Sequence, residues 1–332
     1  MLHQYIDRDS GNPVTEKLFA DPIIRWLYSD LREKAPLVFK ALTGPEASSL
    51  LGFINYETLI GSRISGNYKL LKDLSVKESE FLEPLSALDT PKKIFERKIK
   101  YWECRPVPEN PHSILSPSDS KAIVGSLRET SLLFLKEKFF HFEELLSPKK
   151  KNWLRKFKDG DFSIFRLTPE EYHYNHSPVS GTVVDFYEIQ GDCHSCNPTA
   201  IANLITPFSK NRRVVTVIDT DVPGGSRVGL VAFVEVVAMM IGEIEQCYSD
   251  TRYENPQRIK HGLFMKKGQP KSLFRPGSST VVLFFQVGRI KFASEIISNM
   301  ENKNAVSRFT LNFEKPLVET SVRVRSYLGA PS

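Results

Sequence analysis

The feature that most constrains this chain is residues 271–285, where a turn of small residues runs directly into an apolar strand. The stretch reads KSLFRPGSSTVVLFF. Its run of β-branched and aromatic residues predicts a buried strand. Gly277, Ser278 and Ser279 stand just before that run and leave the backbone exposed and bendable there. Taken by itself this is ordinary turn composition, so any reactive role for Ser279 depends on other parts of the chain.

Length and composition place the chain among ordinary globular proteins. Its 332 residues are enough for one large domain or two, and 41% apolar with 25% charged residues is a typical balance. No run reaches the roughly 18 apolar residues of a membrane-spanning helix, and the first residues lack the apolar core of a signal peptide. We therefore expect a cytoplasmic protein, with peripheral attachment at the inner face of the membrane left open.

The formal net charge of +6 is spread along the chain apart from one basic cluster. That cluster consists of Lys149, Lys150, Lys151, Arg155, Lys156 and Lys158. Such a cluster is usually a solvated face, and contact with an anionic membrane surface is the functional alternative. Basic and aromatic residues are not interleaved as they are in RNA-binding proteins, so we expect no nucleic-acid partner.

The four cysteines give little sign of a metal centre. Cys193 and Cys196 form a CxxC around His194, whereas Cys104 and Cys247 are isolated. A disulfide framework is unusual in a cytoplasmic chain. One CxxC supplies only two of the four ligands of a closed zinc site, so we expect no metal.

The hydrophobic pattern changes from helical to strand-like near residue 105. Residues 14–100 have apolar positions at roughly helical spacing, with Thr15 or Asn12 as the expected cap of the first helix and a break at residues 33–36. Further short helical elements are expected over residues 37–42, 47–56 and 81–88. The proline-rich residues 106–113 are the expected boundary between a helical region, residues 1–105, and a β-rich domain, residues 106–332.

The β-rich domain is expected to contain at least seven strands and one helix. The expected strands span residues 122–124, 162–167, 181–189, 214–219, 228–237, 280–287 and 317–324, and the helix spans residues 132–146. Helices followed by a sheet-rich domain predict an α+β fold.

Three motifs, in order along the chain, resemble those of a known family. Residues 115–119 read LSPSD, residues 173–181 read HYNHSPVSG, and residues 279–285 read STVVLFF. They resemble the Ser-Pro-x-Asp-Gly segment, the His-x-x-His-x-Pro-Val-Ser-Gly signature and the self-cleavage segment of the phosphatidylserine decarboxylase family. The resemblance covers roughly residues 110–330. It implies a self-processing carboxy-lyase that converts phosphatidylserine to phosphatidylethanolamine.

The resemblance also implies how the active group forms. The Ser279 hydroxyl attacks the carbonyl of Ser278, an ester replaces the peptide bond, and elimination leaves a pyruvoyl group at position 279. That group is the electron sink that decarboxylation of an amino acid requires. Both steps need a base; the resemblance implies His176, oriented by Asp119 as in an Asp-His-Ser triad. It places His173 in the mature site, near the substrate carboxylate or the carbanion.

The chain departs from the family pattern next to the cleavage point. Ser278 replaces the usual Gly, and its Cβ narrows the conformations open to the scissile bond. Slower processing and cleavage after Gly277 are therefore open alternatives. Ser120 replaces the Gly of the Asp119 segment, and Pro-Lys-Ser at residues 270–272 replaces the usual Glu-x-Gly.

A second departure concerns the expected substrate pocket. Cys193 stands where the family has an apolar or aromatic residue, and Cys196 stands where it has Val; with His194 they make this loop more polar. A soluble amino acid substrate is therefore an alternative to the phospholipid. A non-processing scaffold or binding protein is an alternative of another class, and a homodimer remains open.

We predict that the purified chain cleaves itself between Ser278 and Ser279. Intact-mass measurement should find an upstream chain of residues 1–278 and a downstream chain of residues 279–332 whose N-terminus is blocked. An active preparation containing only the uncut chain would contradict this prediction.

Overall fold

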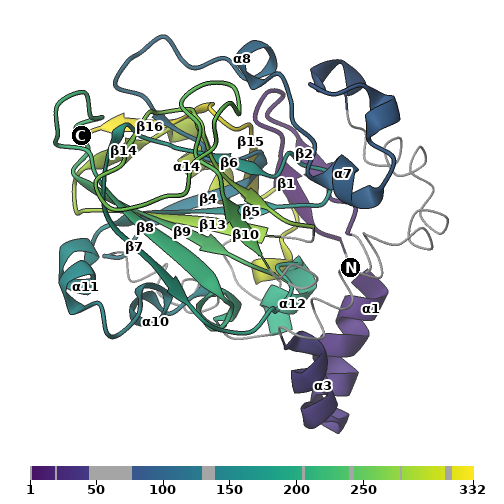
Figure 1. The fold of residues 1–332 in the computed structure, drawn as a ribbon. Helices are drawn as coiled ribbons and strands as arrows, with labels where there is room; N and C mark the ends of the chain where they lie inside the picture. The colour runs from purple at the N-terminus through teal and green to yellow at the C-terminus, as the bar shows by residue number, and fades with distance from the viewer. Residues whose placement is uncertain are drawn as a thin grey trace.

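The computed structural model describes residues 2–18, 21–44, 77–128, 139–203, 206–238, 243–276, 279–310 and 316–332. A ten-stranded sheet forms its centre, in the order β11-β7-β8-β9-β13-β5-β4-β15-β1-β2 (Figure 1). Its strands are β1 (Gln4–Ile6), β2 (Pro13–Thr15), β4 (Ser120–Ser126), β5 (Asp161–Leu167), β7 (Gly181–Ile189), β8 (Arg213–Asp219), β9 (Leu230–Val236), β11 (Phe264–Met265), β13 (Ser279–Phe285) and β15 (Glu319–Val322).

Two three-stranded sheets complete the described β structure. One has the order β10 (Ile244–Gln246), β12 (Pro270–Phe274), β6 (Tyr174–His176), and the other β14 (Ile290–Phe292), β16 (Tyr327–Pro331), β3 (Ile114–Leu115). Asn175 of β6 and Ser272 of β12 both donate hydrogen bonds to Glu235 of β9. The first small sheet therefore faces the large sheet at β9, next to β13.

The helices are short. They are α1 (Asp21–Trp26), the π-helical η1 (Leu27–Leu31), α2 (Arg32–Lys34), α3 (Pro36–Thr43), α7 (Pro91–Phe95), α8 (Tyr101–Cys104), α10 (Phe142–Leu146), α11 (Lys151–Phe157), α12 (Pro198–Asn203), α13 (Pro207–Lys210) and α14 (Ser294–Met300), with 3₁₀ turns η3 (Glu78–Glu80), η4 (Leu85–Ala87) and η5 (Arg308–Thr310). We call residues 21–43 the N-terminal hairpin; it projects from the body of the protein and packs against α12 (Figure 1). No helix in the described ranges is long and apolar enough to cross a bilayer.

The α+β fold class is confirmed, and each of the seven expected strands overlaps an observed one. The expected cap of the first helix is wrong, because Thr15 belongs to β2 and the helix begins at Asp21. The missed signal is the turn of residues 7–12, where the Asp7 carboxylate accepts from the Ser10 N–H at 2.9 Å and Gly11 has a φ of +71°. This turn closes the β1–β2 hairpin.

Of the other helical predictions, one is confirmed, one is wrong and the rest lie wholly or partly outside the described residues. Residues 37–42 are helical and the break before Pro36 is present, since Ala35 leaves the helical region at φ −143°. Residues 81–88 hold only the 3₁₀ turn η4, so the predicted amphipathic helix is wrong there. Residues 47–56 lie outside the described residues, as does the first half of the predicted helix 132–146, of which α10 is described. The boundary near residue 105 stays a prediction, although β1 and β2 join the large sheet.

Residues 279–332 are interleaved with the rest of the chain. β13 lies between β5 and β9 over almost its whole length, and every residue of β13 is buried. β15 lies between β4 and β1. A cut just before β13 therefore leaves the downstream chain hydrogen-bonded on both sides at two places in the sheet.

A buried ionic cluster joins this downstream segment to the N-terminus. The Arg166 guanidinium donates to Glu319 at 2.9 Å and to Glu16 at 2.8 Å, and all three side chains are at most 3% exposed. His3 Nδ1 accepts from the Arg308 N–H at 3.1 Å, so its proton is on Nε2, which lies 3.2 Å from Glu319. His3, Glu16 and Glu319 are close enough to share a cation, and the guanidinium supplies the positive charge there.

We predict that Glu319→Gln lowers the free energy of unfolding by about 1.5–3 kcal/mol at pH 7, because Arg166 loses its charge-assisted hydrogen bonds to Glu319 while Glu16 still balances its charge. Burial by itself raises the pKa of Glu319, but Arg166 and His3 outweigh it and lower the pKa to about 2 from an ordinary 4.5. A lowered pKa stabilises the fold above the unfolded value and stops doing so as pH falls through the folded value. The difference from wild type should therefore shrink between about pH 5 and pH 2 in urea titrations.

The matched control is Asp9→Asn. Asp9 pairs with Arg323 at 3.2 Å with both side chains more than half exposed, so solvent screens the pair and its loss should leave stability unchanged. Equal effects of the two substitutions would contradict the role assigned to the buried cluster.

Candidate active site

Ser279 is the first residue of β13, opposite Leu167 of β5. It is fully buried, and its Oγ has no hydrogen-bond partner among the described residues. A buried hydroxyl without a partner costs free energy, so it calls for an explanation such as a bound water, a ligand or a chemical role. The expected cleavage partner, Ser278, lies outside the described residues.

His176, the last residue of β6, is fully buried with both ring nitrogens engaged. Nδ1 lies 2.9 Å from the carbonyl oxygen of Gly268, which can only accept, so Nδ1 carries the proton. Nε2 is then the unprotonated nitrogen, and it accepts from the Tyr172 hydroxyl at 2.9 Å. Burial lowers the pKa of His176 to about 3, with Arg325 adding to the effect. The side chain is therefore a neutral base across the physiological range.

Asp119 is held by partners other than His176. Arg105 binds its carboxylate through two hydrogen bonds, of 3.1 and 2.7 Å, and the Val324 N–H donates to it at 2.7 Å. The negative charge of Asp119 still favours the protonated form of His176, so its field reaches the imidazole. In the described structure Asp119, His176 and Ser279 are thus not hydrogen-bonded to one another.

His173, just before β6, is also fully buried, and neither of its ring nitrogens has a hydrogen-bond partner among the described residues. Its ring stacks on Phe95 of α7, with centroids 3.5 Å apart and planes 28° from parallel. Burial and the charge of Arg97 hold the pKa of His173 well below its ordinary value. The site thus contains a neutral imidazole with two unused nitrogens.

The side chains of the cysteine loop, residues 193–196, lie in different environments. Cys196 lies with its Sγ 3.8 Å from the carbonyl oxygen of Ser279. His194 instead faces the N-terminal hairpin, where its ring stacks on Phe39 at 6.0 Å. Cys193 packs with Val237. Of the three residues predicted for the pocket, the structure brings Cys196 to Ser279.

Residues 270–272, where the chain departs from the family pattern, contribute to a buried charge pair that the sequence did not reveal. Lys271 Nζ lies 2.7 Å from Glu235, and neither side chain is exposed. Glu235 is opposite Val281, and Ser279 lies two residues earlier on the same face of β13. The Lys271–Glu235 pair with its partners Asn175 and Ser272 therefore forms a polar layer beside the reactive serine.

Sequence reasoning also missed the aromatic and basic residues around the motifs. Tyr172 and Tyr253 share a hydrogen bond of 2.6 Å next to His176, and Tyr101 lies edge-on to the same imidazole at 4.8 Å. Tyr172 could have been found from its place directly before the histidine motif. Arg105, Phe95 and Tyr253 carry no such signal, because they reach the site only through the tertiary fold.

Comparison with known proteins identifies the family of this chain. The family model described as phosphatidylserine decarboxylase matches residues 92–309. A phosphatidylserine decarboxylase proenzyme of Fusobacterium nucleatum is 27% identical over 301 residues, which is 90% of this chain and 93% of the relative. Phosphatidylserine decarboxylase proenzyme 2 of Oryza sativa is 32% identical over 235 residues, 70% of this chain and 34% of the relative. The proenzyme of Clostridium tetani is 24% identical over 302 residues, covering 89% and 91%. The chain belongs to the phosphatidylserine decarboxylase family, a family of carboxy-lyases.

Proposed function

We propose that this chain is a self-processing phosphatidylserine decarboxylase that forms its pyruvoyl group from Ser279. The observation that carries the proposal is the pair of fully buried, unpartnered groups, the Ser279 hydroxyl and the His173 imidazole. Leaving these two groups without hydrogen bonds lowers the stability of the fold. A role in catalysis would explain why the fold accepts that loss. Both belong to motifs that the family shares.

The surroundings of Ser279 fit a pyruvoyl group. Among the described residues the Ser279 Oγ has no hydrogen-bond partner, so its departure with the upstream chain breaks no hydrogen bond in that part of the structure. The strand that carries residue 279 is paired with both β5 and β9, which keep it in place after the chain is cut. Once formed, the group supplies an electron sink for the charge left when carbon dioxide departs.

His176 supplies the base of self-cleavage in this proposal. Its Nε2 is unprotonated, and its other nitrogen is fixed by the Gly268 carbonyl, which sets the tautomer. To reach the Ser279 hydroxyl, Nε2 exchanges its hydrogen bond with Tyr172 for one with the serine. Asp119 acts through its field, which favours the protonated imidazole, while Arg105 and Val324 hold it in place.

His173 acts after cleavage. Its two nitrogens have no partner among the described residues, so the N–H of the neutral ring can donate to the substrate carboxylate without first breaking a hydrogen bond. The ring protonates the carbanion only after its second nitrogen has taken up a proton. Stacking on Phe95 fixes the plane of the ring. Its lowered pKa makes the neutral imidazole the resting form, as expected for a ring buried against Phe95.

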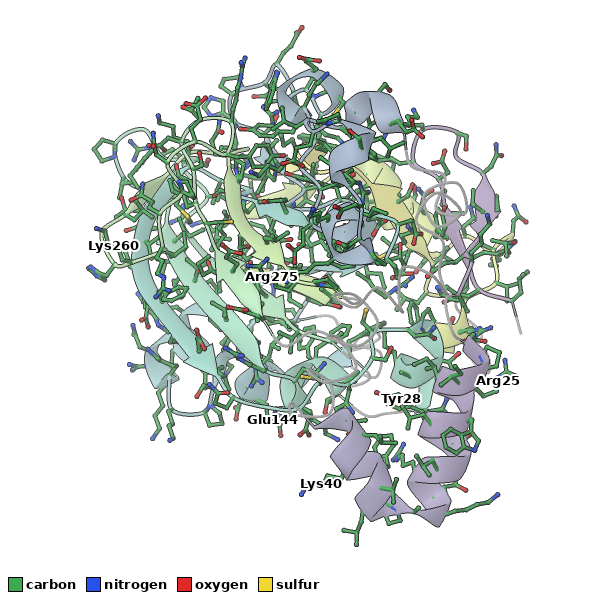
Figure 2. The ribbon with its side chains drawn as sticks, turned by 45° about the vertical axis from the view of Figure 1, so that its right-hand side comes forward. Arg25, Tyr28, Lys40, Glu144, Lys260 and Arg275 are labelled. Atoms are coloured by element: carbon green, nitrogen blue, oxygen red, sulfur yellow. The ribbon has the colours of Figure 1, made fainter. Side chains whose placement is uncertain are left out.

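The N-terminal hairpin is the proposed membrane contact, in keeping with a phospholipid substrate. Four of its large apolar side chains are exposed: Ile23 (64%), Trp26 (52%), Leu37 (82%) and Val38 (50%). In Figure 2, Tyr28 lies where the hairpin meets the body of the protein, with Arg25 and Lys40 on its outer surface. Apolar residues with basic neighbours are typical of a surface that enters the headgroup region of an anionic bilayer. This contact implies peripheral attachment at the cytoplasmic face.

The basic cluster around α11 is apart from this hairpin. The two lie on opposite sides of the view in Figure 1. Lys150 of the cluster also forms an ion pair with Asp185, at 2.7 Å, and a cation–π contact with the ring of Tyr187. We therefore assign the first membrane contact to the hairpin.

The names of the relatives favour the phospholipid over a soluble amino acid. We predict that the processed protein releases carbon dioxide from dispersed phosphatidylserine and yields phosphatidylethanolamine, while a panel of free amino acids gives no product. Turnover of free amino acids without lipid would overturn the substrate assignment. A processed protein that turns over neither would contradict the proposed activity, and an uncut one would support the scaffold alternative.

The assignment of the two histidines predicts that one substitution slows self-cleavage and the other slows turnover. His176→Ala should slow self-cleavage by about 10²–10⁴-fold, because both proton transfers lose their base. His173→Gln, the matched variant, should still yield two chains and lose turnover. Because the pKa of His176 is about 3, the wild-type cleavage rate should stay level from pH 8 to pH 5 and fall only below about pH 4. Normal cleavage in His176→Ala, or a decline centred near pH 6.5, would contradict the assignment.

The hairpin contact predicts a separation of binding from chemistry. Leu37→Asp should weaken binding to vesicles containing phosphatidylserine by about tenfold, since burying such a side chain contributes about 1.5–3 kcal/mol. The KM for vesicles should rise, while kcat on a short-chain soluble substrate should stay unchanged. Ile297→Asp on α14, at a site that is also exposed (46%), is the control and should bind as wild type. Equal binding by all three proteins would exclude the hairpin as the contact.

A further inference from the structure

The thiol of Cys196 lies against the main chain of the reactive residue. Its Sγ is 3.8 Å from the carbonyl oxygen of Ser279 and 3.9 Å from that of Leu167, the residue opposite Ser279 in the sheet. Cys196 is 2% exposed. These distances suit a thiol that donates a weak hydrogen bond to either oxygen. The same residue carries the Ser279 Oγ, which has no hydrogen-bond partner among the described residues.

Each of the three residues before Cys196 is held by hydrogen bonds. The Cys193 N–H donates to the carbonyl of Thr43 at 3.0 Å, and the Ser195 N–H donates to the Tyr28 hydroxyl at 2.7 Å. Between them, His194 exchanges two hydrogen bonds with the Asn211 side chain, at 2.7 and 2.8 Å. Cys196 is therefore held in position by the N-terminal hairpin on one side and by Asn211 on the other.

The carbonyl oxygen of residue 279 gains charge during one step of self-cleavage. After the acyl shift, the Ser279 Oγ is esterified by residue 278. A base then removes the proton on the Cα of residue 279, the Cα–Cβ double bond forms, and the Cβ–Oγ bond breaks, so that Oγ leaves in the carboxylate of residue 278. As the Cα proton departs, negative charge develops on the adjacent carbonyl oxygen. A donor already aimed at that oxygen lowers the barrier to this step.

We infer that Cys196 is this donor and that its S–H group accelerates the elimination step of self-cleavage. The inference rests on the proposed self-processing and extends it, because it assigns the second step to a residue outside the three shared motifs. The acyl shift itself takes place at the carbonyl of residue 278, so Cys196 should affect it little. The two steps can therefore be told apart by which species accumulates.

The test compares Cys196→Val, which removes the donor and keeps a similar volume, with Cys196→Ser, which keeps a donor. In Cys196→Val the ester should accumulate, and hydroxylamine should cut it to give a downstream chain that begins with an unmodified Ser279. We expect elimination to slow by about tenfold, less than the 10²–10³-fold seen on loss of a stronger oxyanion donor. Cys196→Ser should eliminate at a rate close to wild type. Mass spectrometry of the downstream chain, with and without hydroxylamine, measures both rates.

Cys247→Val is the control, since Cys247 lies in the separate cluster around Leu273 and Tyr253. If the valine variant fails to fold, Cys196→Ala takes its place, and circular dichroism checks each protein. Elimination at the wild-type rate in the variants without a donor would overturn the inference, as would a serine variant as slow as valine. Failure of the proposed function looks different, because the wild-type chain would then show neither ester nor cut.

Discussion

The rest of the structure depends on the insertion of β13 between β5 and β9. Its sequence, STVVLFF, has no charged residue, and all seven positions are buried, so the strand is stable only inside the sheet. This places Ser279 at the point where the strand enters the core, with its main chain paired to β5 and its hydroxyl without a hydrogen-bond partner among the described residues. The same insertion explains how the protein keeps its downstream chain after a cut. Strand β15, with Glu319 in the Arg166 cluster, adds a second attachment.

The polar groups around Ser279 fall into two kinds. Lys271 and Glu235 form a buried ion pair, to which the Asn175 amide N–H donates, and these contacts join the small sheet to the large one. Ser279 and His173 have no such partners among the described residues. Because the first kind is rigid, it holds the second in place at a cost to stability that a purely structural fold would avoid. The proposed function places the chemistry at Ser279 and His173.

Sequence patterns predicted the strands well, because alternation and β-branched runs are local properties of the chain. They predicted the N-terminal region less well, since the β1–β2 hairpin forms only through its pairing with β15. For the site, motif order brought together Asp119, His173, His176 and Ser279 as candidates. It could not show that Arg105 binds Asp119 or that Tyr172 binds His176, because these contacts join segments with no shared pattern. It singled out Cys196 as a departure without showing that its thiol contacts Ser279.

The measurement that tests the central claim most directly is covalent trapping of substrate on the downstream chain. Processed protein would be incubated with phosphatidylserine and a mild hydride reductant, and the two chains would then be separated and weighed. The account predicts a mass increase on the chain of residues 279–332, located at residue 279, and none in a preparation first treated with an alkoxyamine that blocks ketones. An adduct on a lysine of the upstream chain, or no adduct in protein that turns over phosphatidylserine, would contradict it.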